Sequence, residues 1–363
     1  MHLYLHIPFC HEICPYCSFY KHKPGSTSQE QFVEALLTEL DWHGQIHDLS
    51  QIETLYLGGG TPSLLSQTHL KTLFQGLHQR LNFQQLKEVT LEANPSTFNL
   101  SKATLIGSLG VTRVSLGVQS FDPAQLKVLG RDHSREEAIT SYHLLRQAGI
   151  PSVNLDLMFS TPGQDLDSWT ETLTTAIELT PDHISCYNLT YEEDTAYFDK
   201  FLSGDYTDEP ERNESFYLTA DRMLQEAGYL HYETSNYAKP GNLSLHNQGY
   251  WRGNPYLGLG PSAVSCIDRK RSKNISDTQA YISRMQSSVG HAVEDIENLD
   301  DEAWRLERLA LELRTTQGCP LKYVERESLQ TLIDHDLITI VSDRFKTTNR
   351  GSCLVDSIVE YLA

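Results

Sequence analysis

Three cysteines crowd into one short stretch with a C-x3-C-x2-C spacing: Cys10, Cys14 and Cys17. Thiolates are the usual protein ligands of iron–sulfur clusters, so three of them on one loop can hold three irons of a 4Fe–4S cluster. The fourth iron then has no protein thiolate and can chelate a small ligand through an amine and a carboxylate. A zinc knuckle is the alternative, and its fourth ligand would be one of three nearby histidines: His6, His11 or His22.

Glycine and polar residues elsewhere fall where predicted strands end. The stretch 57–62, LGGGTP, lets the backbone approach a ligand and exposes N–H groups, although the same run is also compatible with a simple tight turn. Glu92 ends the third predicted strand and could bind a ribose or an ammonium group, with a surface acid as the alternative. Gln119 ends the fourth strand.

Two charged residues complete this set. Arg131 can pair with a carboxylate through two hydrogen bonds, and its alternative is a solvated charge at a helix end. Asp156 lies inside the apolar fifth strand, where a charge is costly unless it is partnered, so a functional role is favoured there.

Alternating strand and helix patterns would bring these residues to one edge of a sheet. The predicted strands, rich in β-branched and leucine residues, are Leu3–Pro8, Ile52–Leu57, Val89–Ala93, Arg113–Val118, Val153–Phe159 and His183–Leu189. The helical patterns between them are Gln29–His43, Thr68–Arg80, Lys102–Ser108, Arg135–Gln147 and Leu166–Glu178. Six such units predict an α/β fold whose parallel sheet forms an open or partial barrel, with chemistry at the C-terminal ends of the strands.

The pattern changes after about residue 205. Glu209–Ala227 is helical, whereas Tyr232–Ser265 shows little regular periodicity. From Asp300 the sequence predicts a small winged-helix-like α+β module with two helices, a hairpin at 337–348 and a last helix near Cys353–Leu362. We therefore expect a core barrel over 1–230, an irregular linking segment over 231–295 and a C-terminal module over 296–363.

Composition restricts the classes of partner. The formal net charge of the 363 residues is −19, which argues against broad binding to nucleic acid or anionic lipid. The first ten residues lack a basic n-region and a long apolar h-region, so we expect no secretory signal and a cytoplasmic location, with peripheral membrane attachment as the second option. Seven cysteines in that compartment should be thiols.

Together these motifs resemble the radical-SAM superfamily and, over nearly the whole chain, the family of oxygen-independent coproporphyrinogen III oxidase and its relatives. The resemblance implies a partial (β/α)6 TIM-type barrel, a 4Fe–4S cluster on the three cysteines and S-adenosylmethionine (SAM) on its open iron. The implied SAM contacts are Tyr4, Tyr16, Gly59, Gly60, Thr61, Glu92, Gln119, Arg131 and Asp156. One departure is Ser160, where the family usually has glycine, so the backbone there is in question.

Three features indicate the HemW branch, the heme chaperones. First, Phe19 stands where coproporphyrinogen III oxidase has a further cysteine. Second, the first strand starts without the long extension that precedes it in that enzyme. Third, residues 246–251 read HNQGYW, which matches the H-N-x-x-Y-W motif of the HemW branch. This motif offers an imidazole that could ligate heme iron and aromatic rings that could cover a face of the porphyrin. The heme-binding set is His246, Asn247, Tyr250 and Trp251. The alternative is that the motif pins a loop over the mouth of the barrel, with His246 hydrogen-bonded and metal-free. Lys239 or Arg252 would meet the heme propionates.

Two classes of function follow from the resemblance. The first is a heme chaperone that binds heme and passes it to acceptor hemoproteins, respiratory ones among the candidates, with an electron donor for the cluster and no coproporphyrinogen oxidase activity. The second is the oxidase itself, which decarboxylates propionates by radical chemistry. Another radical-SAM modification enzyme is a third option. The sequence leaves the acceptor, the electron donor, the oligomeric state and the cleavage of SAM open.

Overall fold

Six parallel strands form the centre of the chain in the computed structural model, which describes residues 1–287 and 290–363. Their bounds are β1 His2–Ile7, β2 Thr54–Gly59, β3 Glu88–Ala93, β4 Arg113–Gln119, β5 Ser152–Phe159 and β6 His183–Asn188. They pair in chain order, each parallel to the next. This confirms the predicted α/β partial barrel, in which all six C-terminal strand ends meet at one rim.

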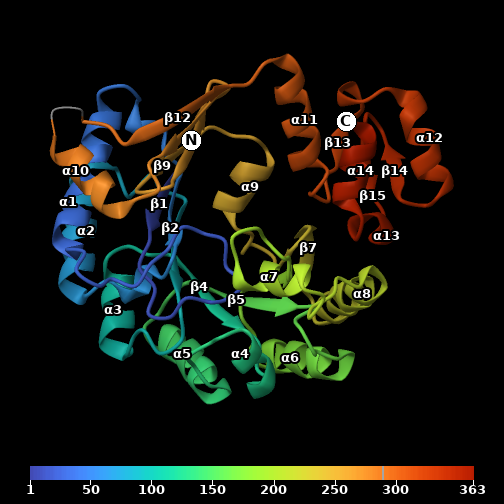
Figure 1. Cartoon of the computed structure of the whole chain (residues 1–363), viewed down its shortest axis with the longest axis horizontal. Coiled ribbons are helices and arrows are strands. Elements are labelled where there is room, and N and C mark those ends of the chain that lie inside the picture. The colour runs from blue at the N-terminus through green and yellow to red at the C-terminus, as the bar shows by residue number, and fades with distance from the viewer. Residues whose placement is uncertain (288–289) are drawn as a thin grey trace.

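Helices cover the outer side of the curved sheet (Figure 1). Their bounds are α1 Gln29–Gly44, α2 Gln67–Arg80, α3 Leu100–Ser108, α4 Pro123–Val128, α5 Arg135–Gln147 and α6 Leu166–Glu178. A capping box starts α5, with Ser134 and Glu137 each bonded to the other's backbone N–H. Gly110 and Gly149 follow α3 and α5 with φ of 97° and 76°, the left-handed backbone that ends a helix.

The prediction of little regular structure at Tyr232–Ser265 is wrong. The segment and its continuation form short strands and helices: β7 Leu230–Glu233, β8 Asn236–Ala238, α9 Leu245–Trp251, β9 Tyr256–Leu259, β10 Val264–Ile267, β11 Lys270–Asn274, α10 Thr278–Gln286 and β12 Val293–Asn298. The strands extend the sheet at both ends, giving the order β12-β11-β10-β9-β1-β2-β3-β4-β5-β6-β8-β7. Strands of three to six residues carry too few positions for a clear two-residue period, and the two that join them to the central sheet, β8 and β9, pair with the distant strands β6 and β1.

The first strand is therefore an internal strand, paired in parallel with β2 on one side and with β9 on the other. A buried carboxylate reinforces this closure. Glu39 of α1 is 1% exposed and accepts hydrogen bonds from Gly260 N at 2.8 Å, the Tyr281 hydroxyl at 2.6 Å and Asn274 Nδ2 at 2.6 Å. These contacts fix the start of the chain to a segment more than two hundred residues later.

Two helices, α7 Ala196–Leu202 and α8 Pro210–Glu226, precede this segment, and a small module ends the chain. The elements of the module are α11 Asp301–Glu312, β13 Cys319–Pro320, α12 Arg326–Asp334, β14 Ile338–Val341, β15 Arg344–Thr347, α13 Asn349–Ser352 and α14 Val355–Leu362. Its antiparallel sheet has the order β13-β15-β14 and packs on a separate core around Phe345. The predicted helix pair and hairpin are confirmed, and the domain boundaries stay predictions. None of the described helices is long and apolar enough to cross a bilayer.

Candidate functional site

The cysteine loop leaves the C-terminal end of β1 and is held by its own backbone. Cys10 N donates to His22 O at 3.0 Å, and His22 N donates to Pro8 O at 2.8 Å, so the two ends of the loop are tied together. Within the loop, Cys17 N donates to Cys14 O at 3.2 Å. All three thiols are free and partly exposed, so the loop presents them at the rim of the barrel.

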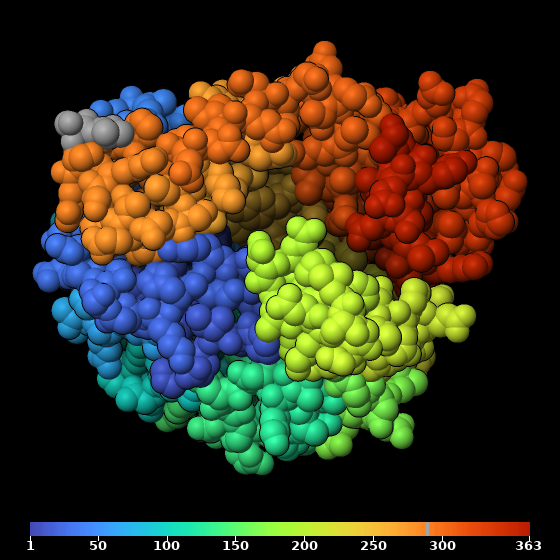
Figure 2. Space-filling view, viewed as in Figure 1, coloured from blue at the N-terminus to red at the C-terminus, as the bar shows by residue number. Residues whose placement is uncertain are grey.

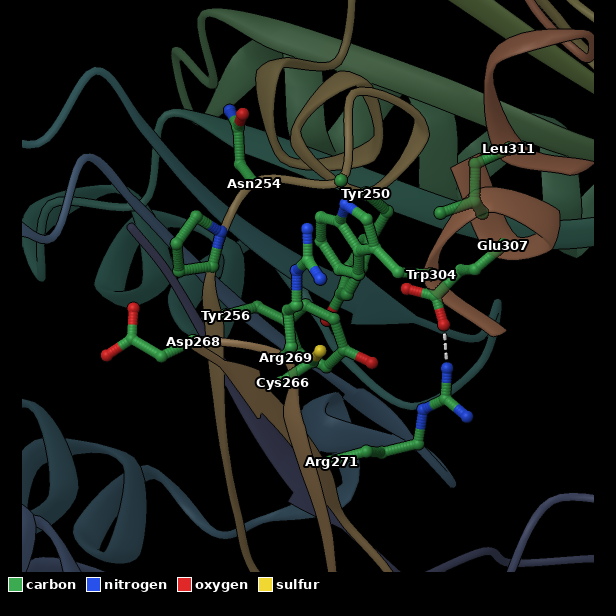
Figure 3. A pocket seen from close by; sticks show the side chains of 12 residues that line it. Tyr250, Asn254, Tyr256, Cys266, Asp268, Arg269, Arg271, Trp304, Glu307 and Leu311 are labelled. Atoms are coloured by element: carbon green, nitrogen blue, oxygen red, sulfur yellow. Dashed lines mark ion pairs between the residues drawn. The ribbon is translucent and has the colours of Figure 1, made fainter. Parts of the chain in front are cut away.

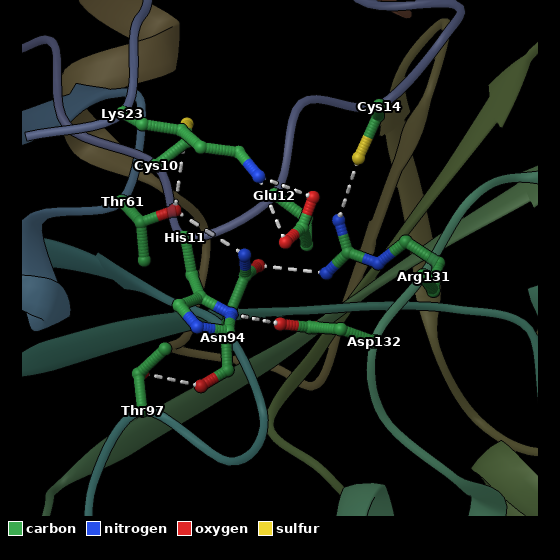
Figure 4. Close-up of polar contacts among 10 residues, drawn as sticks. All are labelled: Cys10, His11, Glu12, Cys14, Lys23, Thr61, Asn94, Thr97, Arg131 and Asp132. Atoms are coloured by element: carbon green, nitrogen blue, oxygen red, sulfur yellow. Dashed lines mark hydrogen bonds and ion pairs between the residues drawn. The ribbon is translucent and has the colours of Figure 1, made fainter. Parts of the chain in front are cut away.

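A chain of hydrogen bonds joins two of these thiols across the ends of four strands (Figure 4). The Thr61 hydroxyl donates to Cys10 Sγ at 3.8 Å, and Asn94 Nδ2 donates to the Thr61 oxygen at 3.2 Å. Arg131 completes the chain, because its Nη2 donates to Asn94 Oδ1 at 2.7 Å and its Nη1 donates to Cys14 Sγ at 3.5 Å. The structure thus brings together Thr61 and Arg131, both predicted, through Asn94, which was not.

The surroundings of the thiols fit anionic sulfur ligands. The Arg131 guanidinium lies against Cys14. Burial raises the pKa of the Cys17 thiol, and the Lys21 ammonium, which donates to the carbonyl of Cys17, lowers it. Burial also raises the pKa of Cys10 to about 11, against the Thr61 hydrogen bond. A thiolate on this loop therefore needs cations or metal ions beside it, and two cationic side chains are already in place.

The histidines that would complete a zinc site are bonded elsewhere. His6 contacts the Tyr20 carbonyl at 2.7 Å, His11 pairs with Asp132 at 2.8 Å, and His22 contacts Thr278 at 2.8 Å. Over residues 1–287 and 290–363, no three His, Cys, Asp or Glu side chains gather as a site for a single metal ion. These contacts do not favour the zinc alternative.

The glycine run after β2 packs against the protein's own chain. A Cβ on Gly59 would lie 2.5 Å from the His6 ring, and a Cβ on Gly60 would lie 2.8 Å from the carbonyls of Ile7 and Phe9. Gly60 N donates to Ile7 O and Thr61 N to Phe9 O, both at 2.8 Å. The expectation that these N–H groups are exposed to a ligand is therefore wrong. The glycines instead let β2 approach the start of the cysteine loop.

Glu92 lies inside the barrel rather than on the surface. Its Oε1 accepts a hydrogen bond from the Tyr56 hydroxyl at 2.7 Å, and its Oε2 accepts one from Gly59 N at 3.1 Å. Tyr4, also predicted, stacks on Tyr56 with ring centroids 6.1 Å apart. Burial raises the pKa of Glu92 to about 7 and the Asp156 charge adds to this rise, while the two hydrogen bonds lower it.

The pKa of Glu92 predicts a pH dependence of stability. Between its usual pKa of 4.5 and about 7, folded Glu92 holds a proton that the unfolded chain has released. The contribution is fully present below pH 4.5 and is lost as pH rises toward 7, by up to about 1.4 kcal/mol per unit. We expect Glu92→Gln to lose less free energy of unfolding than wild type between pH 5 and 7 in urea titrations without SAM. Parallel curves, as expected for the exposed Glu136→Gln control, would contradict this.

Gln119 and Ser160 both adopt a left-handed backbone, with φ of 67° and 59°. Gly117 has no side chain, and the space beside it is filled by Asn94, Gln119 and Arg131. Gln119 Oε1 is buried and makes no hydrogen bond within the described residues. The amide of Gln119 therefore lies near Asn94 and Arg131 at Gly117, and its contact with SAM stays a prediction.

The departure from the family pattern at Ser160 predicts a stabilising substitution. The left-handed backbone costs a residue with a side chain about 1–2 kcal/mol, and the Ser160 hydroxyl is buried without a partner among the described residues. The greater freedom of unfolded glycine offsets about 0.5–1 kcal/mol of the gain. We expect Ser160→Gly to raise the free energy of unfolding by about 1 kcal/mol in urea titrations. Ser160→Ala, which keeps the strained backbone, should gain less, and a loss for Ser160→Gly would contradict the argument.

Asp156 is partnered, deeper in the barrel than the rim. It accepts hydrogen bonds from the Ser115 hydroxyl at 3.0 Å and from Asn154 Nδ2 at 2.7 Å. Asn154 Oδ1 is 2.6 Å from His183 Nδ1, and His183 Nε2 is 2.8 Å from the Tyr232 hydroxyl. Burial raises the pKa of Asp156, and the hydrogen bonds lower it. This network alone explains a charge in the strand, so a structural role accompanies any functional one.

Tyr16, in the cysteine loop, lies beside Cys14 and Arg131 and contacts Tyr197 of α7 with ring centroids 6.2 Å apart. Residues that the sequence did not single out share this site: Lys21, Tyr56, Asn94 and Gly117. A periodicity signal was available for Asn94, which is two positions after Glu92, but not for Gly117, because the strand register shifts between Gly117 and Gln119.

The H-N-x-x-Y-W motif forms α9, which closes the opposite end of the barrel. The Glu88 carboxylate at the start of β3 accepts hydrogen bonds from Leu245 N at 2.8 Å and from His246 N at 3.2 Å, so it caps the helix. A Cβ on Gly249 would lie 2.1 Å from the His2 ring, so only glycine lets α9 pack this closely on β1. The alternative expectation placed the motif over the mouth of the barrel, and it is wrong about the end of the barrel at which the motif lies.

His246 is 1% exposed, inside this floor of the barrel. Its Nδ1 is 2.8 Å from the Thr54 hydroxyl, and its ring stacks on Tyr56 with centroids 4.8 Å apart. Burial and the nearby His2 lower the pKa of His246 to about 3, so the imidazole is neutral. His246 Nε2 makes no hydrogen bond within the described residues. Ligation of heme iron by His246 stays a prediction, and in this arrangement it needs a displacement of α9.

The other residues of the heme-binding set point to different places. Tyr250 and Trp251 line two separate cavities, so the expectation that both cover one porphyrin face is wrong for this arrangement. Asn247 N donates to the Ser244 hydroxyl at the start of α9. Lys239 donates to Thr180 O at 2.8 Å, whereas Arg252 lies in the same cavity as Trp251. Adjacent residues of a short helix diverge by about 100°, which the motif alone does not reveal.

Comparisons with known proteins show the family of this chain. The family model of the radical SAM superfamily matches residues 4–176. The heme chaperone HemW of Synechocystis sp. is 37% identical over 330 residues, covering 87% of this chain and 78% of that protein. HemW of Escherichia coli (strain K12) is 34% identical over 373 residues, covering 99% and 97%. The structure of coproporphyrinogen III oxidase (HemN) from Escherichia coli, described as a radical SAM enzyme, matches with a TM-score of 0.84 and 22% identity. The match covers 99% of this chain and 89% of the HemN chain, and it shows a likeness of fold.

Proposed function

This chain belongs to the HemW family within the radical SAM superfamily, and from that premise we propose that it is a heme chaperone, which binds heme and passes it to acceptor hemoproteins. The observation that carries the proposal is the identity of 34% to a heme chaperone over 99% of this chain and 97% of that protein. Membership of the superfamily implies a 4Fe–4S cluster and SAM. When bound, these groups supply one-electron chemistry.

The residues of the rim have distinct roles in this proposal. Cys10, Cys14 and Cys17 hold the cluster, and the hydrogen-bonded chain through Thr61 and Arg131 orients two of these sulfurs. The other residues that we propose for SAM are Tyr4, Tyr16, Gly59, Gly60, Glu92, Gln119 and Asp156. The two glycines bring β2 close to the cysteine loop, and Asp156 lies deeper in the barrel than the others. Burial of Glu92 and its hydrogen bonds hold that carboxyl in one orientation inside the barrel.

Heme, its acceptors and the electron donor belong to the proposal as well. Heme is cargo here, and we expect no decarboxylation of coproporphyrinogen III. Respiratory hemoproteins are the candidate acceptors, and a cytoplasmic location with contact to the membrane surface would suit that delivery. The motif residues His246, Asn247, Tyr250 and Trp251 stay candidates for heme contact, on or beside α9.

One experiment tests the proposal against the oxidase. Anaerobic, cluster-reconstituted protein is incubated with SAM, a reductant and coproporphyrinogen III, and in parallel it is loaded with hemin and mixed with a heme-free b-type cytochrome. We expect stoichiometric hemin uptake, transfer to the cytochrome and no loss of propionate carboxyls. Formation of protoporphyrinogen without hemin uptake would overturn the chaperone and support the enzyme.

A further inference from the structure

A cavity of about 590 Å³ lies between the sheet extension β9–β11 and helix α11. Figure 2 shows this face hollowed between the orange residues of that extension and the red C-terminal module. None of the residues proposed for the cluster or SAM lines the cavity, and its volume is in the range of about 300–1,000 Å³ that suits a small-molecule ligand. The residues that matter are Tyr250, Tyr256, Cys266, Arg269, Arg271 and Trp304.

Aromatic rings form the walls of this cavity (Figure 3). The rings of Tyr250 and Tyr256 meet edge to face with centroids 4.6 Å apart, and the Arg269 guanidinium lies 5.3 Å above the Trp304 ring. Cys266 pairs with Tyr256 on one side and with Arg271 on the other, so these three side chains project from the same face of the sheet. A flat apolar ligand would find rings from α9, β9 and α11 around it.

Two guanidinium groups line the cavity beside two carboxylates, those of Asp268 and Glu307, in a chain whose net charge is −19. Arg269 donates through Nη1 to Asp301, whose side chain is 97% exposed, and Arg271 donates to Glu297, whose side chain is 55% exposed. Arg271 also pairs with Glu307, whose side chain is only 19% exposed, so Glu297 is the partner of Arg271 that a ligand can replace. Pairs with exposed carboxylates are weak. A ligand carboxylate can therefore replace such a partner, because a guanidinium has five N–H donors and binds carboxylates in a bidentate manner.

The cavity lies at the opposite end of the barrel from the cysteine loop. In the pairing of β1 with β9, Tyr256 is opposite His2, and Cys10 follows His2 by eight residues along the chain. β1 ends at Ile7, so its strand part alone separates the two ends by about 17 Å, at about 3.3 Å per residue. A ligand in the cavity therefore lies at the other end of β1 from the cysteine loop, as suits a cargo rather than a substrate.

We propose that this cavity is the heme-binding site, which accepts a planar iron porphyrin with two carboxylates. The inference rests on the proposed function and names the place where the chain binds its cargo. Tyr250, Tyr256 and Trp304 pack against the macrocycle. Arg269 and Arg271 bind the two propionates, each exchanging an exposed carboxylate of the protein for a ligand carboxylate.

Hemin titration followed by Soret absorbance tests the two arginines in the full-length, cluster-reconstituted protein. Affinity of the R269Q/R271Q variant should fall about tenfold or more, because two sets of charge-assisted hydrogen bonds are lost. The matched control R135Q/R222Q removes two guanidiniums from α5 and α8, and it should bind within about twofold of wild type. Hemin dimethyl ester, whose propionates carry no charge, should bind wild type and R269Q/R271Q with equal affinity.

Tryptophan fluorescence provides a second measurement that does not depend on the arginine variant. A porphyrin beside Trp304 quenches its emission, so Trp304→Phe should remove a large share of the quenching caused by saturating hemin while Soret affinity changes little. The site would be overturned if wild type binds hemin, the affinity of R269Q/R271Q is within about twofold of wild type, and Trp304→Phe shows unchanged quenching. The chaperone proposal would still stand in that case. Wild type that binds no hemin would overturn both.

Discussion

Replacing Cys14 with alanine should leave the protein with no stable 4Fe–4S cluster, and the same result is expected for Cys10→Ala and Cys17→Ala. Three thiolates are the only cysteine ligands that this loop can offer, and two thiolates do not hold three irons of the cluster. Iron content after anaerobic reconstitution should fall from about four per chain toward zero, with loss of the charge-transfer absorbance of the cluster.

The control for this experiment is Cys353→Ala. Cys353 is also a free and partly exposed thiol, but it lies in the C-terminal module, where Sγ contacts Asn349 O at 3.6 Å. Its removal should leave the iron content unchanged. A wild-type protein that carries one tightly bound zinc on the loop, or a Cys14→Ala variant that keeps its iron, would show that the loop has a different metal.

The second large effect is expected at the floor of the barrel, where His246→Ala should reduce the free energy of unfolding by about 3 kcal/mol. The substitution removes the ring that stacks on Tyr56 and leaves a cavity beside the Thr54 hydroxyl, which would keep only its contact with His2 at 2.8 Å. Urea unfolding at constant pH measures the change. His246→Phe keeps a ring of similar size and should lose less.

Comparison of stability with heme binding decides which role His246 has. His335→Ala, at an exposed residue directly after α12, serves as the matched control, and its free energy of unfolding should stay within about 0.5 kcal/mol of wild type. If His246 is only a structural residue, folded His246→Ala binds hemin with an unchanged spectrum. A shifted Soret band with wild-type stability would instead make His246 an iron ligand and contradict the structural argument.

The rim of the barrel could be predicted because its residues are fixed by local sequence. Each strand from β1 to β6 carries enough buried apolar residues to show itself, and the polar residues at its end necessarily meet at one edge of a parallel sheet. The joining of Cys10, Thr61, Arg131 and Cys14 follows from that rule. Asn94 escaped because an asparagine after a strand is also a common turn residue.

The floor of the barrel could not be predicted, because its contacts are made between distant segments. Glu88 caps a helix that begins 157 residues later, and His183 reaches Tyr232 over 49 residues. A buried carboxylate at the start of a strand gives no local sign of the N–H groups it will accept. For the same reason the alternative expectation for the H-N-x-x-Y-W motif was a loop over the mouth of the barrel, whereas the Glu88 cap and the packing of Gly249 on His2 place α9 at the other end.

The internal position of β1 has a consequence for folding on the ribosome. Tyr256, where β9 starts, follows the end of β1 by 249 residues, so at about 5–20 residues per second one edge of β1 waits roughly 12–50 s for its neighbour. The time between synthesis of Glu39 and synthesis of its hydrogen-bond donors Gly260, Asn274 and Tyr281 is similar. An open parallel edge invites pairing with other chains. The nascent barrel therefore stays aggregation-prone until translation is nearly complete, and slowing translation before residue 256 should increase its dependence on folding helpers.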